Sequence, residues 1–222
     1  MTAVVPKFDI DPRYLWSKFV TRVAGDHPDV IRDSFTIITK LYNYPPRSYH
    51  TLAHIAWCLD LLREFFPEEK KRPAWYDRVE LALWFHDIVY DAHRKDNEDR
   101  SARILIGCGA MLGLDPTLTD SAAFDVRATT HSWPIDHTWP VPTQWVLDLD
   151  LASLGFAPEV FDKNSDQIRE EFSFVPDDKF YAGRKIALQG FYERPRIYLT
   201  NECFARFEAQ ARANLKRAIE AL

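Results

Sequence analysis

The sequence predicts an all-α fold, and three observations support that prediction. Apolar residues recur at spacings of three and four through most of the chain, as they do along one face of an α-helix. Proline and capping residues punctuate these segments where helices begin or end, and strand signals do not recur. The chain has 222 residues, of which 46% are hydrophobic, so it can bury a sizeable core. We therefore expect one helical domain over residues 1–222.

The first half of the chain predicts four helices. Two begin at Pro12 and Pro28, because proline favours the first helical position and an aspartate lies shortly before each. The second of them ends before Pro45. A third helix over about 49–66 has an apolar stripe with charged residues on its other faces, whereas a fourth over about 76–90 is apolar nearly all round towards its end. We expect this fourth helix to be buried on most sides.

The second half of the chain predicts six more helices, and the last has a regular amphipathic stripe that favours core packing. The segment 132–142 differs, because it holds three prolines and two tryptophans, Trp133 and Trp139. We predict an irregular loop there, with aromatic rings that anchor it to the core. The six helices are predicted at about 97–112, 118–130, 143–154, 158–172, 177–191 and 204–222.

Charge and composition exclude several kinds of partner. The net charge is -5 and no segment concentrates Lys and Arg without acidic neighbours, so we do not expect binding to a nucleic-acid backbone. No stretch approaches the roughly 18 consecutive apolar residues of a membrane span, and the N-terminus lacks the apolar region of a secretory signal. The three cysteines lie far apart, without a C-x-x-C pair. We therefore expect a cytoplasmic protein without a membrane partner, and a homo-oligomer stays open.

The most informative feature is a histidine beside an aspartate, His86 and Asp87, within the apolar run 81–90. An unpaired carboxylate in an apolar interior costs several kcal/mol or more. The fold must therefore supply a hydrogen-bonded partner, a counter-charge or a metal. A buried hydrogen bond between the two side chains is the simplest alternative to a metal site.

Other histidines and aspartates favour the metal. His50 and His54 are four residues apart, so on a helix both would point into one site. The zincin pattern H-E-x-x-H is excluded, because Thr51 stands where that pattern has glutamate. Downstream, Asp148 and Asp150 lie among leucines. They would point about 200° apart on a helix, so only one of them is expected to face a metal.

In this order, the residues resemble the HD superfamily of metal-dependent phosphohydrolases. The first histidine would be His54, the doublet His86-Asp87, and the last aspartate Asp150 or, as the second choice, Asp148. More narrowly, the chain resembles a bacterial branch of predicted HD phosphohydrolases. The similar strings cover most of the chain and include residues 47–55, 84–91, 97–102, 129–131 and 148–155.

The resemblance implies an HD-domain-like helical bundle, with the metal site between about 48 and 155 and additional C-terminal helices over about 156–222. It also implies hydrolysis of a phosphate ester or phosphoanhydride, with a small soluble molecule such as a nucleotide as substrate, by a metal-activated water. Mixed nitrogen and oxygen ligands without thiolate suit Mn, Fe, Co, Ni or Zn, and they favour Mg less. The implied ligands are His54, His86, Asp87 and Asp150.

Several residues are candidates for catalysis. Asp87 could reach both the metal and the attacking water, whereas His50 or His131 could protonate the leaving group near neutral pH. Glu98 is a further acid-base candidate. The string 49–54 also resembles the H-N-x-x-H motif of cyclic-nucleotide phosphodiesterases, in which the first histidine is the acid.

Candidates for binding a substrate phosphate are Arg47, Lys95, Arg100 and Arg184, since a guanidinium matches phosphate oxygens. Two other classes of function stay open. A di-iron HD-type oxygenase would use His131 as a further ligand, and metal analysis with an absorption spectrum in air would identify it. A sensor that binds a nucleotide or metal without turnover would bind its ligand tightly and release no product.

Overall fold

A computed structural model describes residues 11–45, 47–131 and 138–222, and the regular elements of this part of the chain are ten α-helices and two short 3-10 helices. The prediction of an all-α fold is confirmed. Residues 132–137 of the predicted loop and the first ten residues lie outside the described part. The elements are α1 (Pro12–Ala24), α2 (Pro28–Tyr42), α3 (Leu52–Phe65), η1 (Glu69–Lys71), α4 (Tyr76–Phe85), α5 (Asn97–Leu112), α6 (Pro116–Ala128), α7 (Val141–Asp150), η2 (Leu151–Gly155), α8 (Pro158–Glu171), α9 (Asp177–Tyr192) and α10 (Asn201–Ala221).

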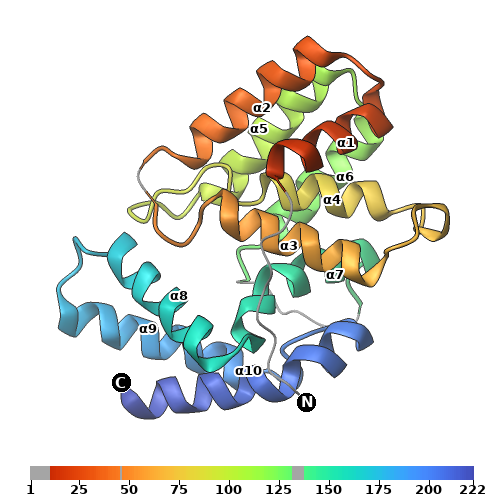
Figure 1. Cartoon of the computed structure of the whole chain (residues 1–222). Coiled ribbons are helices and arrows are strands. Elements are labelled where there is room, and N and C mark those ends of the chain that lie inside the picture. Colours follow the sequence, from red (N-terminus) through yellow and green to blue (C-terminus); the bar gives the residue numbers. More distant parts are fainter. Residues whose placement is uncertain (1–10, 46, 132–137) are drawn as a thin grey trace.

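Helix α4 lies at the centre of the larger body of the molecule, with α1, α2 and α5 above it and α3 below it in Figure 1. Its apolar residues are buried on every face of the helix, as the sequence predicts, and Trp84 and Phe85 are fully buried. The ring of Trp16 from α1 packs against both, with centroid distances of 5.2 and 6.1 Å. This packing fixes the C-terminal end of α4, where His86 and Asp87 follow.

The predicted helix over 76–90 is wrong at its end, because α4 stops at Phe85. Two hydrogen bonds stabilise the turns that follow α4. The Ser101 hydroxyl of α5 accepts from the Val89 N–H at 3.0 Å, and His86 Nδ1 donates to the Leu83 carbonyl at 2.9 Å. The doublet His86-Asp87 therefore lies in a turn beside α5, not within a helix.

The predicted helix over 49–66 is wrong at its start. Helix α3 begins at Leu52, and Thr51 caps it by accepting a hydrogen bond from the Ala53 N–H. His50 lies before the cap, so it does not share a helical face with His54. The prediction that helical spacing brings the two imidazoles together is therefore wrong.

Helices α8, α9 and α10 pack beside this body, and α10 runs along the bottom of Figure 1. Phe207 of α10 is fully buried and contacts Phe156 and Tyr198. The backbone at Gly155 approaches α10 so closely that a Cβ there would lie 2.7 Å from the Phe207 Cβ. Glycine is required for this packing, which fixes η2 and the preceding Asp150 against α10. Buried side chains from α1 through α10 belong to one continuous cluster.

None of the helices in the described part of the chain combines the length and the apolar character that crossing a bilayer requires.

Candidate metal centre and its cavity

The structure brings four predicted ligands together from separate segments. His54 comes from the first turn of α3, His86 and Asp87 follow α4, and Asp150 ends α7. One donor atom from each lies within 4.8 Å of the others. Such a cluster could hold a metal ion.

The distances between these donor atoms fit the ligands of a single cation. With metal–ligand bonds of about 2.1 Å, neighbouring donors lie about 3.0 Å apart at a right angle and about 3.4 Å apart at a tetrahedral angle. His54 Nε2 lies 3.2 Å from His86 Nε2 and 3.2 Å from Asp150 Oδ1. His86 Nε2 lies 3.4 Å from Asp150 Oδ1 and 3.2 Å from Asp87 Oδ2. His54 Nε2 lies 3.7 Å from Asp87 Oδ2, and all four atoms lie within 4.8 Å of one another, so they could surround one cation.

The hydrogen bonds around the cluster direct lone pairs into it. Because His86 donates through Nδ1 to the Leu83 carbonyl, its Nε2 is the nitrogen that faces the cluster, and it offers a lone pair there once it has lost its proton. Asp87 Oδ2 is buried and has no hydrogen-bond partner among the described residues. A buried carboxylate oxygen in this state is costly, and a cation at this point would satisfy it.

The electrostatics of the cluster also favour a positive charge. Burial by itself lowers the pKa of His86, but the carboxylates of Asp87 and Asp150 outweigh it and raise that pKa well above its usual value. Burial raises the pKa of both aspartates, but His86 outweighs it and lowers both below the usual value. Two ionised carboxylates thus share one buried place with a positive charge, which a divalent cation could supply.

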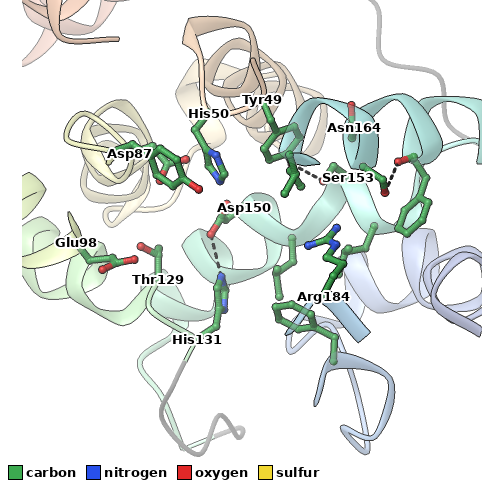
Figure 2. Close-up of a pocket in the computed structure, with 17 residues that line it drawn as sticks. Tyr49, His50, Asp87, Glu98, Thr129, His131, Asp150, Ser153, Asn164 and Arg184 are labelled. Carbon is green, nitrogen blue, oxygen red and sulfur yellow. Dashed lines mark hydrogen bonds and ion pairs between the residues drawn. The ribbon is translucent and has the colours of Figure 1, made fainter. Parts of the chain in front are cut away.

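A cavity of about 780 Å³ opens beside the cluster (Figure 2). Segments far apart in the sequence form its walls, including the turn before α3, α5, η2, α8 and α9. The side chains that line it include six residues predicted to be catalytic, metal-binding or substrate-binding. These are His50, Asp87, Glu98, His131, Asp150 and Arg184.

His50 reaches this cavity through a contact that helical spacing does not provide. Its Nδ1 donates to Glu171 Oε2 at 2.6 Å, and its ring stacks on Tyr90 with centroids 3.8 Å apart. The other oxygen of Glu171 accepts from the backbone N–H groups of Ser48, Tyr49 and His50 at 2.8 to 3.0 Å. The carboxylate at the end of α8 therefore fixes both the turn and the tautomer of His50.

The ionisation of Glu171 is consistent with this role. Burial raises the pKa of the carboxyl, but the hydrogen bonds with His50 and the turn outweigh it and lower the pKa below its usual value. The side chain is only 3% exposed. Because Nδ1 donates to this carboxylate, Nε2 is the nitrogen of His50 that is left to interact with a ligand.

His131 positions Asp150. Its Nε2 donates to Asp150 Oδ2 at 2.9 Å, the oxygen that does not face His54 (Figure 2). The backbone of His131 has a φ of 51°, a left-handed conformation that is uncommon for residues other than glycine. Arg194 donates to its carbonyl at 3.2 Å. This conformation follows directly on the end of α6 and turns the imidazole towards the aspartate.

Glu98 lies in the first turn of α5 and faces the same cavity (Figure 2). Burial raises the pKa of its carboxyl, and the nearby charges of Asp87 and Asp150 raise it further. A carboxylate with a raised pKa is a stronger base than one in water. Glu98 therefore fits the predicted role of an acid-base group.

Arg184 is the cation of the cavity wall opposite Glu98. Burial lowers the pKa of its guanidinium. Among the described residues, no carboxylate forms an ion pair with it. A partly buried guanidinium without a counter-charge is suited to bind an anionic ligand.

The prediction that Arg47 binds substrate is wrong, because the backbone occupies its guanidinium. Arg47 donates to the carbonyls of Asp87 at 2.6 Å and Ile88 at 3.0 Å, after α4. It also donates to the carbonyls of Leu41 at 2.9 Å and His50 at 3.2 Å. Arg47 therefore holds the two turns that carry the site residues.

Two other predicted phosphate contacts lie away from the cavity. Lys95 and Arg100 are exposed and do not line it. The choice between the two aspartates of α7 is settled by geometry: Asp148 accepts from the N–H groups of Leu199 and Thr200, at 2.8 and 2.7 Å. Asp148 therefore holds the residues that lead into α10, whose N-cap is Thr200, and Asp150 is the aspartate that joins the cluster.

Sequence reasoning missed Glu171 and Asn164. Glu171 is 121 residues from His50, and nothing in its local pattern distinguishes it from the adjacent Glu170. Asn164 of α8 is 4% exposed, and both polar atoms of its amide are buried without a hydrogen-bond partner. It lines both this cavity and a neighbouring one of about 660 Å³ against α3. The sequence offered one signal for Asn164, because it is a polar residue on the inner face of a predicted helix.

No family model, curated protein or solved structure matches this chain. The relation to the HD superfamily therefore stays a prediction, which rests on the order of His54, His86-Asp87 and Asp150 in the sequence. The fold and the site define the molecule more coarsely, as an all-α protein with a buried His/Asp cluster that could hold a metal ion beside a cavity.

Proposed function

We propose that this protein is a metal-dependent hydrolase of a phosphate ester or phosphoanhydride, with a small phosphorylated molecule such as a nucleotide as its substrate. One observation carries the proposal. Asp87 and Asp150 of the four-residue cluster line a cavity together with His50, a histidine held by a carboxylate, and with Arg184, which has no carboxylate partner among the described residues. A place for a cation, a proton donor and an anion-binding group thus lie in one cavity.

The donors His54, His86, Asp87 and Asp150 would hold the cation. Two imidazoles and two carboxylates suit Mn, Fe, Co, Ni or Zn. When bound, such a cation would lower the pKa of a water molecule and offset negative charge on the phosphoryl group.

His50 would protonate the leaving oxygen. Its Nδ1 is committed to Glu171 at 2.6 Å, so Nε2 is the nitrogen available to the cavity. The bond to the carboxylate and the stack on Tyr90 restrict rotation of the ring. General acid catalysis of this kind contributes typically about 10²–10⁴ in rate.

Glu98 would accept the proton of the attacking water, since its pKa is raised and it lies on the same wall of the cavity as Asp87. Arg184 would bind a phosphate oxygen from the opposite wall. Asn164 would pair with polar atoms on the rest of the substrate, because a buried amide without partners costs about 1–3 kcal/mol per unsatisfied group. The side chains of these three residues would thus contact the same bound substrate.

The test combines metal quantification with a panel of substrates. Purified protein is analysed for metal, stripped, and reloaded separately with Mn, Fe, Co, Ni, Zn and Mg. Phosphomonoesters, phosphodiesters and nucleoside di- and triphosphates are then assayed for product. We expect about one or two ions per chain and turnover of at least one class with a transition metal. The matched control is Asp150→Asn, which should bind little metal and release no product.

The same experiment separates the alternatives. Two irons per chain, with consumption of oxygen and no release of phosphate, would replace the hydrolase with an oxygenase. Tight binding of a nucleotide to the loaded protein without product over hours would replace it with a sensor. Absence of metal binding in the wild-type protein would overturn the proposal in every form.

A further inference from the structure

A further, smaller cavity lies at the C-terminal end of α3 and the N-terminal end of α4. These are the ends of the two helices that lie away from the candidate metal centre. His54 begins α3 and Arg63 lies in its last turn, whereas α4 begins at Tyr76 and ends beside His86. The cavity has about 430 Å³ of empty space. At 1.5 Å per residue, Arg63 lies roughly 14 Å along α3 from His54, so this cavity is separate from the metal centre.

Basic side chains outnumber acidic ones in this cavity. Lys18, Arg22, Arg63 and Arg72 line it, with Glu69 and Glu80 as the carboxylates. Glu80 is already paired with Arg22, which also donates to Asp77 at 2.8 Å. Glu69 is 75% exposed and lies 3.7 Å from Arg72. Among the described residues, Lys18 and Arg63 form no ion pair with a carboxylate, so their positive charge remains available in the cavity.

Two polar groups in the cavity are buried and have no hydrogen-bond partner in the part of the chain that the structure describes. These are Arg63 Nη1 and the hydroxyl of Tyr76, a residue that is only 2% exposed. The guanidinium of Arg72 lies over the Tyr76 ring at 4.2 Å, and its Nε makes only a long contact of 3.4 Å with the Phe66 carbonyl. Burial raises the pKa of Tyr76, so its hydroxyl stays protonated and can donate. All three groups are donors that lack a good acceptor.

We propose that this cavity binds a small tetrahedral oxyanion of the phosphate type, with Arg63, Arg72 and Tyr76 as its donors. Guanidinium groups match the oxygens of such an anion and bind them with charge-assisted hydrogen bonds. The oxyanion supplies the acceptors that buried donors require, because an unsatisfied buried donor is costly. Free inorganic phosphate and the phosphate group of a small molecule share this chemistry. The inference does not depend on the proposed hydrolase function.

The first test locates the anion in the wild-type protein. Crystals of metal-free protein are soaked in selenate, whose anomalous scattering identifies its position. We expect a peak between Arg63, Arg72 and Tyr76. Density for selenate only beside Arg184, or for water alone in the α1–α3–α4 cavity, would overturn the proposal.

The second test measures affinity by calorimetry on metal-free protein that carries Arg184→Met, so that the metal-centre cavity does not contribute. Phosphate is titrated against chloride of matched ionic strength. We expect Arg63→Met and Arg72→Met each to weaken phosphate binding at least about tenfold, and Tyr76→Phe about threefold. The matched control is Arg32→Met on α2, a residue 64% exposed, which should change nothing.

Phenyl phosphate forms the other arm of this titration. Equal affinity for phosphate and phenyl phosphate would show that the cavity recognises the phosphate group alone. Tighter binding of phosphate would identify free inorganic phosphate as the ligand, and tighter binding of phenyl phosphate would identify a phosphorylated small molecule. Binding of phosphate within twofold of wild type in both arginine variants would show that the anion binds elsewhere and would overturn the assignment.

Discussion

Asp148 and Asp150 are two carboxylates of α7 that lie two residues apart in the sequence. The groups that surround their side chains differ in kind. Asp148 accepts from two backbone N–H groups and from the Thr200 hydroxyl, all at the start of α10. Asp150 accepts from His131 through Oδ2, and its Oδ1 faces the imidazoles of His54 and His86 in the cluster of four possible ligands. The protein completes the hydrogen bonding of Asp148, whereas Asp150 lies in a cluster where Asp87 Oδ2 has no hydrogen-bond partner among the described residues. Where the fold completes the partners of a buried polar group, that group has a structural role, and where it does not, a ligand is implied.

Two arginines beside the candidate metal centre, Arg47 and Arg184, differ in the same way. Arg47 donates to backbone carbonyls on both sides of the site. Arg184 lines the cavity and, among the described residues, has no carboxylate partner. Position in the sequence would not separate them, since both are arginines beside predicted site segments. The partners that each has in the folded protein distinguish them.

Exchanging each aspartate for asparagine gives the largest contrast. Asp150→Asn removes a negative ligand and should weaken metal binding by at least about 100-fold, with loss of turnover. Asp148→Asn should bind metal as the wild type does, but it should lower the free energy of unfolding by about 1–3 kcal/mol because the cap of α10 is weakened. Metal titration and urea unfolding measure the two effects. Equal loss of metal in both variants would remove the distinction between the two aspartates.

The next contrast concerns proton transfer. His50→Gln should reduce kcat by about 10²–10⁴ on the substrate found in the panel, with metal content unchanged. Glu171→Gln should reduce kcat less, by about tenfold, because the imidazole remains but an ionised carboxylate no longer fixes its orientation. Metal analysis of both variants is the control, and loss of metal in His50→Gln would place His50 among the ligands instead.

Replacing the two arginines separates binding from stability. Arg184→Met should raise KM by about 10-fold to 100-fold without loss of stability, since it removes a charge-assisted bond to the substrate. Arg47→Met should leave carbonyls of both turns unpaired and lower the free energy of unfolding by about 2–4 kcal/mol. Steady-state kinetics and urea unfolding measure these outcomes. An unchanged KM in Arg184→Met would show that the phosphate binds at another group.

The same contrast explains how far the sequence predicts this molecule. Proline positions and apolar spacing predicted most helices within a few residues, because those signals act locally. The doublet His86-Asp87 was recognised because burial of a carboxylate is costly wherever the chain places it. The end of α4 was missed, since the hydroxyl of Ser101, from another helix, holds the turn. Glu171 and the role of Arg47 were missed for the same reason: their partners are distant in sequence.

The smallest expected effect is the dependence of stability on acid. The folded-state pKa of Glu171 is lowered below the usual value, because the hydrogen bonds with His50 and the turn outweigh burial. The unfolded chain therefore binds a proton at a higher pH than the folded chain does, so this carboxylate stabilises the fold above the unfolded pKa of about 4.3. That stabilisation is lost as the pH falls through the folded pKa.

Glu171→Gln should remove this contribution, so the free energy of unfolding should fall less steeply than in the wild type as the pH is lowered below about 4.3. Urea unfolding at several pH values from neutral to acidic measures the slope in both proteins. The matched control is Glu170→Gln on the neighbouring residue, which should keep the wild-type slope. A parallel dependence in all three proteins would mean that the bond between Glu171 and His50 is weak in solution, and the proposed orientation of His50 would fail with it.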